Sequence, residues 1–177
     1  NNVLLVVATG SVLLGTLYPL LIDALGMGKL SVGPPYFNAV FVPVMVPLLL
    51  LMAVGPMAHW KHADLRAIAR RLRVSMALAV IAGIAFPLLM GAWTPLTALS
   101  SLLAVWIVAS GVFQIMDRMK TGRPTAAFWG MHVAHFGIAV FVIGVAMVGG
   151  YQEEKDVRME PGDSVSVGGY GFRLVEV

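Results

Sequence analysis

Two histidines inside a long apolar segment are the residues of this sequence whose types and spacing most suggest chemistry. The segment WGMHVAHFGIAVFVIGVAMVGG runs from Trp129 to Gly150 and carries His132 and His135, three residues apart. A run of this length can cross a bilayer as a helix, and three residues are about one helical turn, so both imidazoles lie on one face. Burying a polar group in hydrocarbon is costly unless it is paired, which makes the pair a candidate functional site.

Three roles fit such a pair. A neutral imidazole can hydrogen-bond to a neighbouring helix and only pack. It can relay protons, although transporters usually supply further intramembrane carboxylates, and Asp23 and Asp117 lie near the ends of apolar runs. It can also bind haem iron as an axial ligand, and Gly130 and Gly137 would let a flat ring approach the helix backbone.

Haem ligation by two histidines would need a second helix. His132 and His135 lie on the same face of one helix, so they cannot take opposite axial positions on one iron. No other predicted helix of this sequence contains a histidine. A second histidine ligand would therefore have to come from outside this sequence.

Composition indicates an integral membrane protein. The 177 residues are 59% hydrophobic and 12% charged, and the mean hydropathy is +0.86. The net charge is only +3, and the basic residues lie beside apolar runs, so membrane lipid is the expected partner and nucleic acid is not. The absence of cysteine excludes disulfides, thiolate metal sites and covalent haem attachment to this chain.

Five runs of about 20 apolar residues predict five transmembrane helices within residues 1–149. The predicted helices cover 3–25, 37–58, 74–93, 96–117 and 126–149. From residue 150 to residue 177 the sequence becomes polar, with a turn signal at Pro161-Gly162 and alternating stretches at 164–167 and 172–177. The predicted fold class is an all-α polytopic membrane protein followed by the start of a small β-domain.

The basic residues predict the orientation in the membrane. Eight of them fall on one side, in loops 59–73 and 118–123. The positive-inside rule places both loops in the cytoplasm and everything after Gly150 outside. Loop 59–73 is amphipathic, so we expect it to lie along the cytoplasmic interface together with His59 and His62, with docking of a cytoplasmic partner as the alternative.

Several separated segments resemble the later part of the CcmF family, the large membrane subunit of the cytochrome c maturation haem lyase. These segments are NNVLLVVATGSVLLGTLYPLLIDAL, KLSVGPPYFN, GMHVAHFGIAVFVIGV and EPGDSVSVGGYGFRLVEV. The resemblance implies a multi-pass protein of the bacterial inner membrane. It also implies that the chain holds the family's later transmembrane helices and the start of its periplasmic domain.

The resemblance further implies a function and its partners. Such a protein takes haem, its substrate, from a periplasmic haem chaperone and works with a lyase subunit that holds apocytochrome c. Together they promote thioether bonds between the haem vinyl groups and the cysteines of a CxxCH motif. The family's tryptophan-rich haem-handling segment and its periplasmic histidines do not occur in this sequence, so we expect the chain alone not to be a complete lyase and leave its catalytic residues unassigned.

The resemblance also implies a cofactor, a non-covalent b-type haem held between two membrane histidines. The later of these matches the AHFG motif, which makes His135 the expected axial ligand of the haem iron. Phe136 and Gly137 of the same motif are expected to border the haem, and His132 to play a weaker supporting role. The alternatives are a non-catalytic scaffold or transporter segment whose histidines only pack, and a subunit of a b-type electron-transfer cytochrome.

Overall fold

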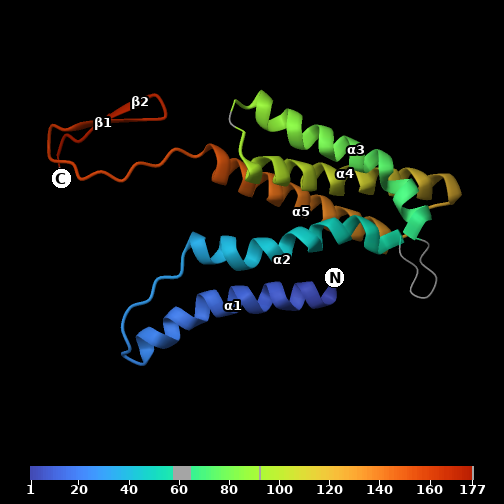
Figure 1. Cartoon of the computed structure of the whole chain (residues 1–177), viewed down its shortest axis with the longest axis horizontal. Helices are drawn as coiled ribbons and strands as arrows, with labels where there is room; N and C mark the ends of the chain where they lie inside the picture. The colour runs from blue at the N-terminus through green and yellow to red at the C-terminus, as the bar shows by residue number, and fades with distance from the viewer. Residues whose placement is uncertain (58–64, 92, 177) are drawn as a thin grey trace.

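Five long helices and a terminal β-hairpin make up the computed structural model, which describes residues 1–57, 65–91 and 93–176 (Figure 1). The helices are α1 (Asn2–Ala24), α2 (Pro34–Val54), α3 (Leu65–Leu89), α4 (Pro95–Thr121) and α5 (Ala126–Tyr151), and the short 3-10 turn η1 (Gly55–Met57) follows α2. All five long helices have the length and apolar character needed to cross a membrane. The predicted fold class is therefore confirmed.

Local sequence signals set several helix starts. Thr94 caps α4 by accepting a hydrogen bond from the Thr97 backbone N–H at 3.1 Å, and Pro95 occupies the first helical position. Thr125 caps α5 in the same way, through the N–H of Phe128. These caps satisfy backbone donors that a helix start otherwise leaves free, so the starts of α4 and α5 fall within a residue of their predicted positions.

The start of α3 differs most from the prediction. The sequence predicted an interfacial segment over 59–73 and a separate span from Val74, whereas α3 runs without a break from Leu65 to Leu89. Ile68 and Leu72 are buried in the core, and their spacing of four residues continues the apolar face of the span. One continuous helix therefore contains both segments, while residues 59–64 of the predicted loop, with His59 and His62, lie outside the described residues.

The second basic loop, predicted over 118–123, is also shorter than expected. α4 continues to Thr121, so Arg118 and Lys120 lie in its last turn. Basic side chains are favourable at a helix C-terminus because the carbonyl groups there carry partial negative charge. The connection between α4 and α5 is accordingly limited to residues 122–125.

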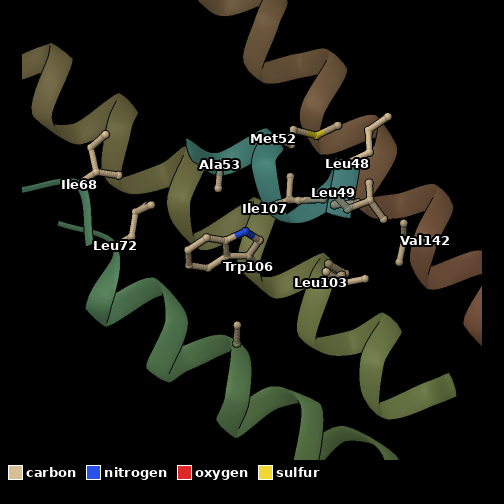
Figure 2. Close-up of a cluster of buried hydrophobic side chains, with 13 residues drawn as sticks. Leu48, Leu49, Met52, Ala53, Ile68, Leu72, Leu103, Trp106, Ile107 and Val142 are labelled. Atoms are coloured by element: carbon tan, nitrogen blue, oxygen red, sulfur yellow. The ribbon is translucent and has the colours of Figure 1, made fainter. Parts of the chain in front are cut away.

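Helix α4 is the centre of the bundle. It packs extensively against α3 and α5 and also contacts α2, whereas α1 packs mainly on α2. Figure 2 shows Leu103, Trp106 and Ile107 of α4 among buried side chains of α2 and α3. Trp106 donates a hydrogen bond from Nε1 to the Leu50 carbonyl of α2 at 3.0 Å, and the Gln114 amide donates to the Ala53 carbonyl at 3.3 Å.

A glycine marks each of three helix crossings. A Cβ atom added to Gly15 of α1 would lie 2.6 Å from the Tyr36 ring of α2, and one added to Gly111 of α4 would lie 2.7 Å from the Phe136 ring of α5. One added to Gly83 of α3 would lie 3.0 Å from a backbone carbonyl of α4. Small residues allow membrane helices to approach closely enough for dispersion contacts, which is the packing mode expected in lipid.

The polar terminus forms a two-stranded antiparallel hairpin of β1 (Ser164–Val167) and β2 (Tyr170–Arg173). The turn at Pro161-Gly162 and the first strand fall where the sequence predicted them. The second strand begins at Tyr170 rather than at residue 172, because Gly168 and Gly169 both have positive φ angles, +60° and +79°, and form a two-residue turn that pairs Val167 with Tyr170.

The two ends of the bundle differ in what they carry. The hairpin and the α1–α2 connection lie at one end, and the N-terminus, the start of α3 and the α4–α5 connection lie at the other (Figure 1). The second end carries the basic residues of α3 and α4, whereas Lys29 is the only basic residue of the α1–α2 connection. The charge asymmetry predicted from the sequence therefore coincides with a single end of the folded bundle.

The glycine of α3 offers a test of close packing. We expect Gly83→Leu to destabilise the bundle by about 1 to 3 kcal/mol, because the new side chain would meet the backbone carbonyl of Ala98, which cannot rotate away. Gly10→Leu is the matched control, since no atom lies within 4 Å of a Cβ placed there. Thermal unfolding of both variants in detergent measures the difference, and equal melting temperatures would contradict close packing at Gly83.

Candidate functional site

Both candidate histidines are positioned by the first half of α5. The helix begins at Ala126, so at about 1.5 Å per residue His132 lies roughly 9 Å and His135 roughly 13 Å along its axis. α5 also packs along α4, which fixes how far each imidazole is turned toward the bundle. The depth of the two rings is therefore set by local helix geometry, whereas their surroundings depend on α4.

His132 belongs to the interface between α5 and α4. Its side chain is only 1% exposed, and its ring packs against Phe128, with centroids 4.3 Å apart, and edge-on against Phe136. Nδ1 lies 3.0 Å from the Phe128 carbonyl oxygen, so a proton on Nδ1 is donated to that carbonyl. In this tautomer the lone pair is on Nε2, and the backbone bond fixes the orientation of the ring.

His135 lies at the edge of that interface and is partly exposed. Its ring centroid is 6.4 Å from that of His132, at an interplanar angle of 51°. Within the described part of the chain its ring nitrogens have neither a hydrogen bond nor an ion pair. Of the two imidazoles, His135 is therefore the one that a ligand approaching α5 from outside the bundle can reach.

Phe136 and Gly137, the other two residues predicted to border a cofactor, do not lie on the same side of α5 as His135. Phe136 is partly buried, and its ring occupies the space left by Gly111 of α4. Gly137 is exposed, with nothing within 4 Å of an added Cβ, and two residues along a helix are about 200° apart. The structure therefore brings His135 and His132 together but places Gly137 on the opposite side of α5, where it cannot border a ring bound to His135.

The described residues offer one accessible imidazole, that of His135. They contain no group of three or more His, Cys, Asp or Glu side chains able to hold a metal ion, and none of the other described helices carries a histidine. His135 fits a single axial ligand because its imidazole is accessible from one side and not engaged by a hydrogen bond. A six-coordinate haem here would need its second ligand from elsewhere.

Sequence reasoning did not separate the two histidines by their contacts. Two signals could have done so. One is Phe128, one turn before His132, and the other is Gly111, whose missing side chain leaves room on α4 for the His132 and Phe136 rings. The first is visible in the sequence as an aromatic residue at position i−4. The second requires knowing which part of α4 lies opposite α5.

The fold and this site together define a polytopic helical membrane protein with an accessible histidine on α5. Comparison with known proteins finds relatives along nearly the whole chain. It is 44% identical to the cytochrome c-type biogenesis protein CcmF of Pseudomonas fluorescens and 38% identical to CcmF of Escherichia coli, over 97% and 100% of its length. It is also 38% identical to the cytochrome c-type biogenesis protein CycK of Rhizobium meliloti, over 98% of its length.

These similarities assign the chain to the CcmF family of cytochrome c-type biogenesis proteins, as the sequence resemblance predicted. The chain spans 27 to 28% of the length of the relatives just described. No family model matches the chain, and no solved structure matches it significantly.

The different burial of the two histidines predicts different effects on stability. We expect His132→Ala to lower the free energy of unfolding by about 2 to 4 kcal/mol, because it removes a buried ring that packs against Phe128 and Phe136 and its hydrogen bond to the Phe128 carbonyl. His135→Ala is the matched control, and we expect it to change stability by less than about 1 kcal/mol. Unfolding of both variants in the same detergent tests the assignment, and a larger loss in His135→Ala would refute it.

Proposed function

We propose that this chain acts in cytochrome c maturation as the later membrane part of a CcmF-type haem lyase in the bacterial inner membrane. The observation that carries the proposal is the similarity of nearly its whole length to cytochrome c-type biogenesis proteins of several bacteria. The substrate is haem, which the protein receives from a periplasmic haem chaperone. A further lyase subunit holds apocytochrome c while thioether bonds form.

Within this function, His135 is the axial ligand that this chain contributes to a b-type haem. Its partly exposed imidazole can offer a neutral nitrogen to iron from the surface of α5. His135 would hold such a haem on α5, and the bound group would supply one-electron redox chemistry next to the haem that is being delivered. His132 acts through packing, because its fixed ring lies beside His135 and holds this part of α5 against α4.

The orientation follows from charge. The end of the bundle with the basic residues of α3 and α4 faces the cytoplasm, and the end with the hairpin faces the periplasm, where haem and apocytochrome meet. In this orientation the polar segment after Tyr151 leads out of the membrane on the side of the chemistry. The chain therefore connects a membrane haem site with the periplasmic part of the lyase.

A membrane scaffold is the second candidate function. Burial of His132 and its hydrogen bond to the Phe128 carbonyl favour it, because a histidine that only packs between helices has these contacts. His135 lacks them. The two candidates therefore differ in what they predict for His135.

The ligand assignment is tested by visible spectra of the full-length protein, oxidised and reduced. We expect a low-spin b-type spectrum that His135→Ala abolishes or reduces at least tenfold, because an axial ligand is lost. His132→Ala, corrected for the amount of folded protein, should keep most of the bound haem. Equal loss from both variants, or a haem-free parent protein, would favour the scaffold.

The orientation is tested with a phosphatase reporter that is active only outside the cytoplasm. Fused after Gln152, the first residue beyond α5, it should be active, and fused after Gly122, just beyond α4, it should be inactive. Replacing Arg118 and Lys120 by Gln in the second fusion should raise its activity if these charges help to set the orientation. The reverse pattern of activity in the first two fusions would overturn the charge argument.

A further inference from the structure

A cavity opens at the basic end of the bundle, away from the two histidines. It has a volume of about 620 Å³ and lies between the end of α4, the first turns of α3 and α5, and the η1 turn. This volume is within the range of roughly 300 to 1,000 Å³ found for small-molecule sites. Neither the helix packing nor the proposed haem ligation uses this space.

Most of the charged residues that line the cavity are basic. Arg71 of α3 and Arg118 and Lys120 of α4 contribute positive charge, and Asp117 contributes the one carboxylate. Lys120 pairs with Asp117 at 3.6 Å, whereas Arg71 and Arg118 form no ion pair with any described residue. Two guanidinium groups from different helices therefore line a cavity whose one carboxylate, that of Asp117, is paired with Lys120.

The cavity lies at the level of the lipid headgroups. α4 has no charged residue from Pro95 to Met116, a stretch of 22 residues that spans roughly 33 Å and so crosses the whole hydrocarbon core. Asp117, Arg118 and Lys120 come directly after this stretch. α3 repeats the arrangement in reverse, since Arg71 and Arg73 directly precede its uncharged part.

Apolar groups complete the lining. Pro56 and Met57 of η1 cover one side, and Phe128 of α5 covers another. A ligand that fills the cavity thus meets cations at one part of its surface and hydrocarbon at another. An amphiphile whose anionic group adjoins an apolar body has this combination, whereas a free inorganic anion uses only the charged part.

We propose that this cavity binds the phosphate group of an anionic phospholipid. Guanidinium groups bind phosphate oxygens through paired, charge-assisted hydrogen bonds, and Arg71 and Arg118 supply two such groups from two helices. The apolar walls at Pro56, Met57 and Phe128 receive the glycerol backbone and the first methylene groups. Basic pockets between transmembrane helices bind lipid headgroups in this way.

Lipid in this cavity would tie together three helices near the candidate site. Phe128 lines the cavity and also contacts His132, through its ring at 4.3 Å and through its carbonyl oxygen. A lipid held by Arg71 and Arg118 would therefore bridge α3 and α4 and pack against the turn of α5 that orients His132. The proposal does not depend on haem binding or on which side of the membrane this end faces.

The test measures lipid binding to the purified full-length protein in detergent, by native mass spectrometry during titration with dioleoyl phosphatidylglycerol. We expect much tighter binding of this lipid than of dioleoyl phosphatidylcholine, whose choline cancels the phosphate charge. Each basic side chain near a headgroup contributes roughly fivefold in affinity, so Arg71→Gln with Arg118→Gln should weaken phosphatidylglycerol binding roughly 25-fold. Melting temperatures confirm that the variant is folded.

The matched control is Arg70→Gln with Arg123→Gln, which removes the same charge from the same end but not from the cavity lining. It should change binding less than threefold. An equal loss of phosphatidylglycerol binding in both double variants would show that general surface charge causes it, and would contradict a binding site in the cavity. Equal binding of the two lipids by the wild-type protein would overturn it without any variant, and tight binding of glycerol 3-phosphate alone would show a free phosphate site instead of a lipid site.

Discussion

Close approach at glycine is the constraint on which the rest of the structure depends. Inside a bilayer, helices gain little by hiding apolar surface from one another, so contact at short distance has to hold them together. Gly15, Gly83 and Gly111 provide that contact at the α1–α2, α3–α4 and α4–α5 crossings. The third crossing also positions the candidate site, because the space above Gly111 is filled by Phe136 and bordered by the His132 ring.

Hydrogen bonds to backbone carbonyls fix the position of α4 along α2. Trp106 and Gln114 of α4 donate to the carbonyl groups of Leu50 and Ala53, in the last part of α2. These bonds hold the end of α2, and with it η1, over the basic end of α4. Because η1 is held there, Pro56 and Met57 line the same cavity as Arg118.

The two histidines show how neighbouring residues of one type acquire different roles. The two side chains are about 300° apart around α5. His132 therefore lies in the interface with α4, and His135 lies at the edge of that interface. The buried ring is oriented by the Phe128 carbonyl and contributes to stability. The partly exposed ring of His135 keeps its nitrogens free of hydrogen bonds within the described chain, which is the property that the proposed ligation requires.

The sequence by itself determined those features that depend on short stretches of chain. Runs of apolar residues specified the five helices, the proline-glycine pair specified the turn at Pro161, and several separated segments identified the family. Only the tertiary structure decided that Leu65 to Arg73 joins α3, that His132 is buried, and that Arg71 and Arg118 line one cavity. Each of these depends on which part of another helix lies opposite, and helix periodicity defines a face without naming the residues that cover it.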